Sequence, residues 1–314
     1  MDKKYIILIA VIAIVAIIGV FAFMGSGSDS DVVKIGYLPS DHDSALFVAQ
    51  ADDSYGKKGI KIETVQFNNG GDLMTAMASG EVDIGYVGIT PVLSSIDKGV
   101  PVKVISGAQI EGSGLVVGKD SGINSVQDLK GKSIATPGEA SIQYMLLEYA
   151  LSKEGMSIDD VDASAMKVAP MNDALNSGKI DAMLTYEPFV TIAVENGAGT
   201  VLESSSDILP DHPCCVVVAS DDFINNNPED LDAILEIHEN ATNYLKENPN
   251  EAANKLPAEV VSDVEVEKKS LSNIKFVSGL DDAYKQTIMD FMDLEIELGL
   301  LKEAIPEDKI FYSK

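Results

Sequence analysis

Two stretches of the chain repeat one pattern of apolar and polar positions. Residues 76–91 read AMASGEVDIGYVGITP, and residues 174–188 read ALNSGKIDAMLTYEP. Each begins as a short helix, stops at a glycine, continues as a buried strand and ends in a turn with a proline at a new helix start. Glycine suits the left-handed position after a helix, and proline suits the first helical turn. Two such copies predict two similar α/β lobes with a cleft between them, the alternative being two unrelated helix–glycine–strand units.

The rest of the folded part alternates between strand and helix patterns. Short apolar or alternating runs predict strands at residues 32–37, 61–67, 102–106, 133–136, 162–168 and 214–220. Helical stripes predict helices at residues 141–153, from Pro228 onward and at residues 281–300. Strands that alternate with helices indicate parallel sheets flanked by helices. We therefore expect an α/β fold, with His238 on the exposed face of the helix that follows Pro228.

The N-terminal segment has a different character. Lys3 and Lys4 precede an uninterrupted apolar run from Tyr5 to Met24, which is long enough to cross a bilayer as a helix. The two lysines favour a cytoplasmic N-terminus, which places the rest of the chain outside the cytoplasm. An uncleaved transmembrane anchor and a removed signal peptide both fit this pattern. We assign residues 1–30 to this segment and its polar tether, and we expect an extracytoplasmic protein, either anchored or secreted.

The charge of the chain narrows the choice of partners. The formal net charge is -27, and all 23 basic residues are lysines, so the chain contains no arginine. A nucleic-acid partner is excluded, because phosphate backbones require clustered positive charge. A bidentate arginine clamp for an anion is excluded as well. An anionic ligand would have to be held by helix N-termini, backbone N–H groups, hydroxyls or a lysine.

Turns at predicted strand ends are the candidate binding site. Residues 38–43, 69–72, 88–91, 138–141 and 186–188 each connect a strand end to a helix start. In α/β sheets, ligands bind beyond the carboxyl ends of the strands, where helix N-termini offer free N–H groups and partial positive charge. Simple helix capping accounts for any single turn. Because such turns occur in both predicted lobes, we expect a small-molecule site between them.

Motifs for other chemistry are weak or missing. Gly112-Ser113-Gly114 with Gly118 departs from the dinucleotide fingerprint, because the third glycine falls one residue late and an extended run follows it. The sequence holds no phosphate-binding GxxxxGK[ST] loop and no GxSxG nucleophile motif. The chain has two cysteines, which are adjacent, so no disulfide framework is expected.

A metal site is an alternative for part of the predicted cleft. The segments Asp41-His42-Asp43 and Asp211-His212-Pro213-Cys214-Cys215 could together supply metal ligands. None of the three histidines has a paired metal-binding spacing, and polar loop residues more often cap helices or bond a ligand. We therefore predict no metal, no cofactor and no catalytic residue.

Several segments resemble one family of transport proteins. They are GYLPSDHDSALFVAQ at 36–50, GIKIETVQFNNGGDLMTAMASGEVDIGYVG at 59–88, GVPVKVISGAQIEGSGLVV at 99–117, INSVQDLKGKSIATPGEAS at 123–141, ALNSGKIDAMLTYEP at 174–188 and HPCCVVVASDDFI at 212–224. They resemble the periplasmic-type solute-binding proteins of ABC importers for nitrate, sulfonates, taurine and bicarbonate. That group also contains binding proteins for pyrimidine precursors of thiamine. The likeness covers nearly all of residues 32–310, and its motifs are specific to the superfamily but poor guides to the ligand.

The resemblance implies a two-lobed periplasmic-binding-protein-like fold of type II with two hinge strands. Lobe 1 would comprise residues 31–117 and 217–314, lobe 2 would comprise residues 118–216, and the hinge strands would lie near residues 115–119 and 216–220. One of the two adjacent cysteines would point into the cleft. The ligand contacts carried over by motif are Tyr37, His42, Asn69, Gly70, Gly71, Asp72, Gly88, Ile89, Thr90, Gly112, Ser113, Gly138, Glu139, Ala140, Ser141, Tyr186, Glu187 and Cys214.

The resemblance also implies a monomeric carrier that captures a small solute and delivers it to an ABC permease and its ATPase subunits. A small oxyanion or organic sulfonate is the expected ligand; a zwitterion such as taurine, or a pyrimidine stacked on Tyr37 or Tyr186, is the alternative. Enzymes such as pyrimidine synthases and dehydratase-like proteins share this architecture. An enzyme could use His42, Glu187 and Cys214 here. We expect no enzyme, because an exported chain favours capture over metabolism.

Overall fold

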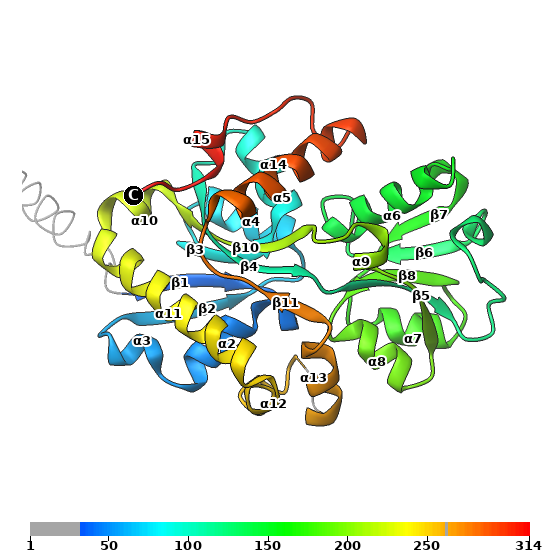
Figure 1. Ribbon diagram of the computed structural model, residues 1–314, viewed down its shortest axis with the longest axis horizontal. Helices are drawn as coiled ribbons and strands as arrows, with labels where there is room; N and C mark the ends of the chain where they lie inside the picture. The colour runs from blue at the N-terminus through cyan, green and yellow to red at the C-terminus, as the bar shows by residue number, and fades with distance from the viewer. Residues whose placement is uncertain (1–31, 261–262) are drawn as a thin grey trace, which may run out of the picture.

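The computed structural model describes residues 32–260 and 263–314 and shows two α/β lobes side by side (Figure 1). Each lobe is built on one mixed sheet that is flanked by helices. The predicted N-terminal membrane or signal helix lies outside the described residues. Within the two described ranges, no helix combines the length and the apolar character that crossing a membrane requires.

The first lobe contains a six-stranded sheet of order β11-β4-β10-β3-β1-β2. β1 is parallel to β2 and β3, whereas β10 is antiparallel to β3 and β4, and β11 is antiparallel to β4. The central strands are buried almost throughout, as expected for strands covered on both faces. The strands are β1 (Val32–Tyr37), β2 (Lys61–Gln66), β3 (Ile84–Gly88), β4 (Val102–Glu111), β10 (Pro213–Ser220) and β11 (Ile274–Phe276).

The second lobe contains a five-stranded sheet of order β7-β6-β8-β5-β9. β6 is parallel to β7 and β8, and β5 is antiparallel to β8 and β9. The strands are β5 (Ser113–Gly118), β6 (Ser133–Thr136), β7 (Asp162–Ala165), β8 (Ala182–Tyr186) and β9 (Gly199–Ser204). In the order of the sheet, β7, β6, β8, β5 and β9 take the places that β2, β1, β3, β10 and β4 hold in the first sheet. The two repeated segments supply β3 and β8, which are equivalent strands, so the predicted pair of similar lobes is confirmed.

One aspartate in each repeated segment fixes the pairing of its parallel strands. Before β3, the N–H of Asp83 donates to the carbonyl oxygen of Lys34 at 3.0 Å, and its carboxylate accepts the Lys34 N–H at 2.8 Å. Before β8, Asp181 makes the same two bonds with Ser133, both at 2.9 Å. The aspartate of the SGxxD pattern therefore joins β3 to β1 in the first sheet and β8 to β6 in the second.

Helices pack on both sheets and place several of their N-termini toward the gap between the lobes. The helices predicted at residues 141–153 and 281–300 begin one residue later, because Ser141 and Asp281 are N-caps whose side chains accept backbone N–H groups. The first lobe has η1 (Asp41–Asp43), α2 (Ser44–Ala51), α3 (Ser54–Lys57), α4 (Gly70–Ala78), α5 (Ile89–Asp97), α10 (Asp221–Asn226), α11 (Pro228–Glu247), α12 (Pro249–Ala252), α13 (Val264–Leu271), α14 (Asp282–Glu297) and α15 (Glu307–Ile310). The second lobe has η2 (Val126–Leu129), α6 (Ile142–Lys153), η3 (Ile158–Asp160), α7 (Met171–Asn176), α8 (Phe189–Glu195) and α9 (Ser205–Ile208).

The chain passes between the two sheets at two places. β4 ends at Glu111 in the first sheet and β5 begins at Ser113 in the second, so the first crossing is at Gly112. The return crossing lies at residues 209–212, between α9 and β10. Both crossings come a few residues before the hinge strands that the sequence predicted. The lobe boundaries at residues 117/118 and 216/217 stay a prediction.

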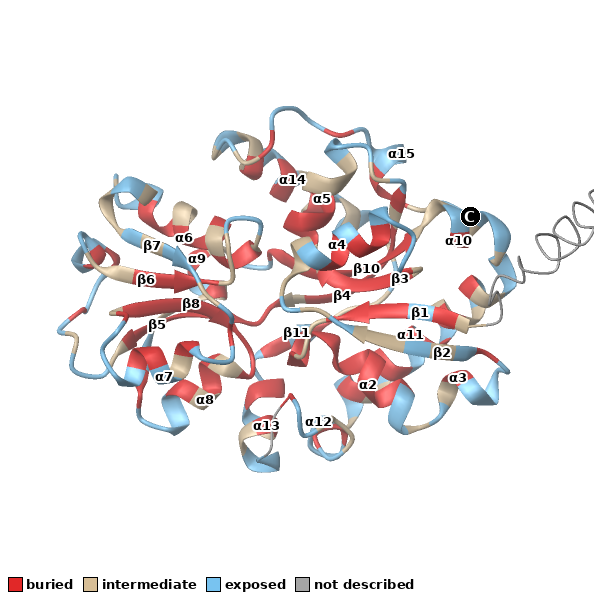
Figure 2. Ribbon diagram, turned by 180° about the vertical axis from the view of Figure 1, so that it is seen from behind, coloured by how far each residue is buried: buried red, intermediate tan, exposed pale blue. Residues whose placement is uncertain are grey.

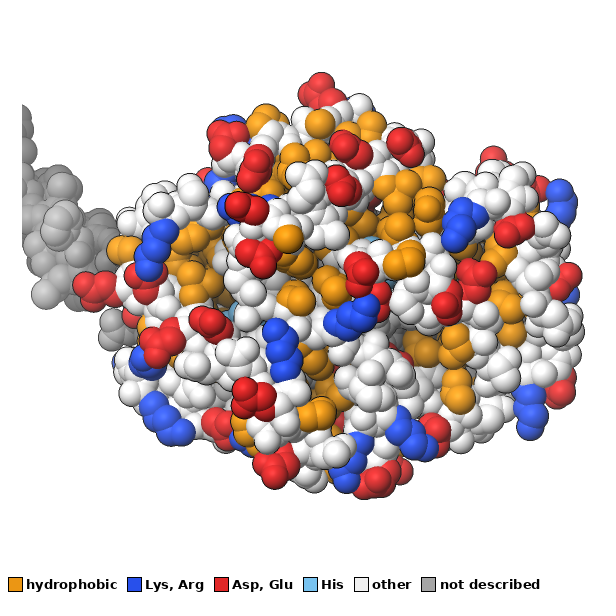
Figure 3. Space-filling view, viewed as in Figure 1, with side chains coloured by type: hydrophobic (Ala, Val, Ile, Leu, Met, Phe, Trp, Pro, Cys, Tyr) orange, Lys and Arg blue, Asp and Glu red, His pale blue; other side chains and the backbone are white. Residues whose placement is uncertain are grey.

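Buried residues concentrate in the strands of both sheets and on the helix faces that pack against them (Figure 2). Leu46 and Leu73 are fully buried in the first lobe, and Leu115 and Met145 are fully buried in the second. The interior of each lobe is therefore apolar, and these four residues belong to one continuous buried cluster. On the face shown in Figure 3, lysine and acidic side chains are interspersed, without a continuous basic region.

Candidate functional site

A cavity of about 310 Å³ lies between the two lobes. Its lining comes from the turns after β1, β2 and β6, from the ends of β3, β7 and β8, from the starts of α4, α5 and α6 and from the first residues of β10. Strand carboxyl ends and helix N-termini are the parts of an α/β fold that bind ligands. The volume lies at the lower end of the range for small-molecule sites.

Most of the predicted contact residues lie in this lining. They are His42, Asn69, Gly70, Gly71, Gly88, Gly138, Glu139, Ala140, Ser141, Tyr186 and Cys214. Their role in binding stays a prediction. The lining also contains residues that were not among the predicted ligand contacts, namely Leu38, Ser40, Asp43, Tyr86, Pro91, Pro137, Ile142, Gln143, Ala165 and Cys215. The predicted contacts that the structure places outside the lining are Tyr37, Asp72, Ile89, Thr90, Gly112, Ser113 and Glu187.

Some of the predicted contacts outside the lining support residues inside it. The Ser113 hydroxyl accepts a hydrogen bond from the Gln143 side chain at 3.0 Å, and Gln143 lines the cavity. Asp72 accepts from the Asn69 amide at 2.9 Å. Tyr37 turns away and donates its hydroxyl to Glu259 at 3.0 Å. Ser113 and Asp72 therefore lie one layer behind the wall.

Glu187 is buried behind the cavity and connects the second lobe to the C-terminal part of the chain. Its carboxylate accepts from the N–H and the hydroxyl of Thr191, both at 3.0 Å, and from the Asn273 side chain at 2.8 Å. Burial raises the pKa of Glu187, and these bonds oppose that rise. The geometry makes Glu187 part of the contact between α8 and α13 and not of the cavity wall.

Three helices from both lobes begin at the cavity. α4 is capped by Asn69, whose side chain accepts from the Asp72 N–H, and α6 is capped by Ser141. α5 begins after Gly88, which has no side chain to cap it. The first N–H groups of a helix have no partner within it and carry partial positive charge. No lysine belongs to the cavity lining among the described residues, so these helix starts supply positive potential that no lysine provides there.

Asp43 is a buried acid in the same lining. Burial raises its pKa to about 8, although the Leu38 N–H donates to the carboxylate at 2.8 Å and opposes the rise. A carboxyl group with this pKa is mostly protonated at neutral pH. It therefore repels an anion in the cavity less than an ordinary aspartate would.

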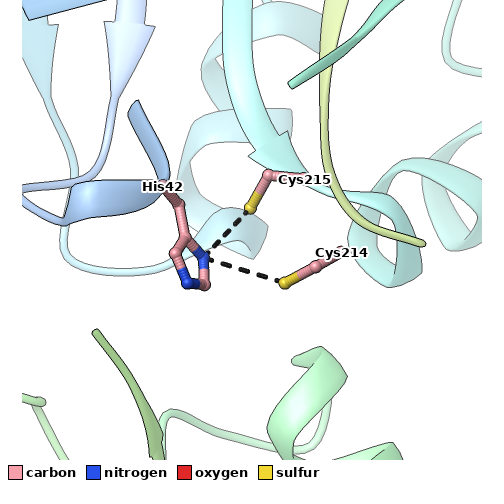
Figure 4. Close-up of side chains that lie close together, drawn as sticks. All are labelled: His42, Cys214 and Cys215. Carbon is pink, nitrogen blue, oxygen red and sulfur yellow. Dashed lines mark hydrogen bonds between the residues drawn. The ribbon is translucent and has the colours of Figure 1, made fainter. Parts of the chain in front are cut away.

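His42, Cys214 and Cys215 meet at the wall of the cavity. The Nδ1 atom of His42 lies 3.7 Å from the Sγ atom of Cys214 and 3.5 Å from that of Cys215. All three residues are buried. Figure 4 shows both sulfur atoms directed toward the imidazole. The family resemblance implies that one cysteine points inward, whereas both approach His42, because β10 is irregular on either side of Cys215.

The three groups share their protons unequally. Burial raises the pKa of the Cys214 thiol, but a hydrogen bond from Cys215 and the charge of His42 outweigh burial and bring this pKa well below its usual range. The hydrogen bond to Cys214 raises the pKa of Cys215. Burial lowers the pKa of His42, yet the charge of Cys214 raises it above the ordinary value. These shifts favour the thiolate form of Cys214 over that of Cys215.

His238 is buried, so its predicted place on the surface is wrong. The Nε2 atom lies 2.8 Å from the carbonyl oxygen of Gly107, and Nδ1 lies 3.0 Å from the hydroxyl of Tyr86, which lines the cavity. His238 lies on the same helical stripe as Leu231, Ile234 and Ala241, which are all buried. That spacing was the signal in the sequence that could have placed it inside.

Two sheets of matching order, two crossings and a cavity between the lobes define a two-lobed periplasmic-binding-protein fold. The chain belongs to the NMT1-like family, which it matches over residues 26–262. The resemblance noted in the sequence is confirmed at this level.

The similar proteins include two solute-binding proteins and one enzyme. A Bacillus subtilis (strain 168) protein, provisionally named as aliphatic sulfonates-binding, is 28% identical over 282 residues, which cover 87% of this chain and 82% of that protein. A 4-amino-5-hydroxymethyl-2-methylpyrimidine phosphate synthase of Schizosaccharomyces pombe is 29% identical over 220 residues, covering 65% of this chain and 62% of the enzyme. The structure of the alkanesulfonate-binding protein SsuA from Xanthomonas axonopodis pv. citri, bound to MOPS, has a TM-score of 0.79 at 21% identity and covers 90% of this chain and 98% of that one.

Proposed function

We propose that the chain is the extracytoplasmic solute-binding component of an ABC importer and that it captures a small oxyanion or organic sulfonate between its lobes. The observation that carries the proposal is the meeting of three helix N-termini, those of α4, α5 and α6, at one cavity. Helix N-termini bind anions through free N–H groups and their dipoles. Because the three helices come from both lobes, a ligand that contacts all of them would favour lobe closure.

The names of two relatives support this ligand class. The Bacillus subtilis protein is named for aliphatic sulfonates, and the SsuA structure is named for alkanesulfonates. Both names describe binding proteins, and this also supports the proposal that the chain binds a solute and is not an enzyme. A permease and an ATPase would be the partners of such a carrier. The apolar run from Tyr5 to Met24 supports a place outside the cytoplasm, by an anchor or after signal cleavage.

A thermal-shift screen of the purified chain tests the ligand. The panel contains nitrate, sulfate, bicarbonate, taurine, alkanesulfonates and a hydroxymethylpyrimidine. A ligand present at 100 times its dissociation constant should stabilise the fold by about 2.7 kcal/mol. A saturable shift from one anionic class would support the proposal. A shift from the pyrimidine alone would favour the precursor-binding alternative, with Tyr186 as the stacking residue in the lining.

A matched pair of variants at Gly71 tests the helix N-termini directly. Gly71 lines the cavity in the first turn of α4, and only the Asn69 side chain would lie near an added Cβ, at 3.3 Å. Gly71→Asp adds a negative charge that the helix start tolerates, so folding should persist while an anion is repelled. Gly71→Asn has the same size without the charge. We expect the aspartate variant to bind the anion at least about tenfold more weakly than the asparagine variant. Equal binding would mean that the anion lies elsewhere.

A second candidate is an enzyme on the same fold, and the Cys214–His42 pair is the observation in its favour. A thiolate beside a histidine is the arrangement of an activated nucleophile, and one relative is named a synthase. Mass spectrometry of the compound released from denatured protein separates the two functions. A carrier releases its solute unchanged, whereas an enzyme releases a product that Cys214→Ser would abolish.

A further inference from the structure

Three potential metal-binding atoms meet at the cavity wall from distant parts of the chain. They are Nδ1 of His42 in η1 and the Sγ atoms of Cys214 and Cys215 at the start of β10, and they all lie within 4.8 Å of one another (Figure 4). His42 is 172 positions before Cys214, so the tertiary fold creates this cluster. Imidazole and thiolate are the donors that thiophilic transition metals prefer.

The distances between these atoms fit a common metal ion. Zinc bonds of 2.0–2.1 Å to nitrogen and about 2.3 Å to sulfur, at a tetrahedral angle, separate nitrogen from sulfur by about 3.6 Å. The observed separations are 3.7 Å to Cys214 and 3.5 Å to Cys215. A metal ion bound by all three atoms accounts for both separations.

The imidazole of His42 is oriented for this role. Its Nε2 atom lies 3.0 Å from the carbonyl oxygen of Gly112, and a carbonyl oxygen only accepts, so Nε2 carries a proton. In the neutral ring, Nδ1 is then the free donor atom that faces the two sulfurs. Metal-binding histidines commonly donate their other ring N–H to a backbone carbonyl, which fixes the ring and its tautomer.

The irregularity in β10 brings two neighbouring cysteines to one ion. In a regular strand, adjacent side chains point to opposite faces. The pairing of β10 with β4 shifts on both sides of Cys215, and such bulges redirect side chains. Cys214 and Cys215 are both buried and both border the cavity.

We propose that His42, Cys214 and Cys215 bind a thiophilic transition-metal ion of the Zn²⁺ type, whose remaining coordination position faces the cavity and receives the captured solute. Closed structural zinc sites have four protein ligands, whereas sites with three keep a position for an exogenous ligand. Metal binding displaces any proton that remains on these donor atoms. The ion gives an anionic solute a positively polarised contact in a lining without lysine. The identity of the solute rests on the proposed function, but the metal site does not.

Cobalt(II) titration of the metal-stripped full chain, under reducing conditions, tests the site. Co²⁺ replaces Zn²⁺ in tetrahedral sites and gives a thiolate-to-cobalt charge-transfer band. We expect one ion per chain, a band that Zn²⁺ displaces, and binding that is weaker by about 100-fold or more in Cys214→Ser, Cys215→Ser and His42→Gln. Circular dichroism and thermal unfolding of the metal-free variants show whether they fold. If a serine variant does not fold, X-ray absorption of the native cobalt form still reports the number of sulfur ligands.

His212→Asn is the matched control, because His212 precedes Cys214 by two residues but lies outside the donor cluster. It should keep the band. The proposed donor set would be overturned if the native chain gave no charge-transfer band, or if X-ray absorption showed fewer than two sulfur ligands on the cobalt ion. It would also be overturned if His212→Asn lost the band while His42→Gln kept it.

Adding the solute panel to the cobalt form tests the open position. A change in the cobalt spectrum that saturates with one solute is the expected result. An unchanged spectrum, with a solute that still gives a thermal shift, would overturn coordination of the solute and leave the carrier function in place. Cobalt binding without any solute binding would leave the metal site standing and count against the carrier function.

Discussion

Tyr86 and His238, which are 152 positions apart, join through a buried hydrogen bond of 3.0 Å between hydroxyl and imidazole. Nε2 of His238 lies 2.8 Å from the carbonyl oxygen of Gly107, which only accepts, so Nε2 carries the proton and Nδ1 accepts from Tyr86. Tyr86 lines the cavity. The position of this cavity side chain therefore depends on a neutral histidine on α11.

We expect mild acid to destabilise the fold through His238. Burial lowers its pKa to about 4, whereas the usual value is about 6.5. Between these values the unfolded chain binds a proton that the folded chain excludes, so stability is complete above about pH 6.5 and falls as the pH drops toward 4. From pH 7.5 to pH 5, this residue alone should remove roughly 2 kcal/mol of unfolding free energy. Urea unfolding of the native chain and of His238→Gln at both pH values measures the difference.

Tyr86→Phe is the matched control for this prediction. It removes the partner hydroxyl but keeps the buried imidazole, so its dependence on pH should match that of the native chain. The variants must be compared with the native chain at each pH, because buried carboxyl groups with a raised pKa make the fold more stable in acid and so oppose the effect of His238. If His238→Gln lost as much stability in acid as the native chain, the prediction would be wrong.

Glu295 should make the fold less stable at neutral and alkaline pH than in mild acid. Both carboxylate oxygens are buried without a hydrogen-bond partner among the described residues, and burial raises the pKa from 4.5 to about 7. The folded chain keeps this proton while the unfolded chain loses it, so stability falls as the pH rises from 4.5 to 7 and stays lower above. Glu295→Gln should therefore gain up to roughly 3 kcal/mol at pH 8 and little at pH 4.5. Urea unfolding at the two pH values checks this, and Glu297→Gln, which is exposed on the same helix, should show no such gain.

The aspartates of the two repeated segments should each stabilise their own lobe. Asp83 and Asp181 each accept a strand N–H and donate their own N–H to the same neighbouring residue. Removing a carboxylate leaves a strand N–H without its acceptor, so Asp83→Ala and Asp181→Ala should each cost about 1–2 kcal/mol in chemical unfolding. Lys179→Ala, two residues before Asp181 and exposed, is the control. A cost no larger than that of the control would show that these bonds do not stabilise the pairing.

Most of the fold could be predicted because its signals are local. The apolar runs that form β3 and β8 and the glycine and proline beside them are visible in a short window. The sheet to which a strand belongs is a non-local property. Ser113 begins β5 in the second sheet, and its apolar run looks the same whichever sheet it joins, so the predicted hinge strands lay too late in the chain.

The sequence was sufficient to predict which turns form the site, but not which side chains contact one another there. Turns after parallel strands converge in any α/β sheet, which is why the turns at Asn69 and Gly138 were selected. The contact of His42 with Cys215 spans 173 positions and depends on an irregular strand, and no periodicity encodes it. His238 was assigned to the surface by its polarity, whereas the buried Tyr86 hydroxyl and Gly107 carbonyl provide it with partners that only tertiary structure reveals.

Gly112, at the crossing between the sheets, should accept no side chain. Its φ is 80°, and an added Cβ would lie 3.0 Å from Nε2 of His42 and 3.1 Å from Ile274. Gly112→Ala should therefore pay about 1–2 kcal/mol for the left-handed backbone and, in addition, push His42 away from the Gly112 carbonyl that orients it. Gly122→Ala is the matched control, because its φ is 70° and nothing lies within 4 Å of an added Cβ. Chemical unfolding should show the larger loss for Gly112→Ala, and the thermal shift with solute should weaken in that variant alone. Equal losses in the two variants would mean that backbone strain is the whole effect and that the cavity wall does not depend on this glycine.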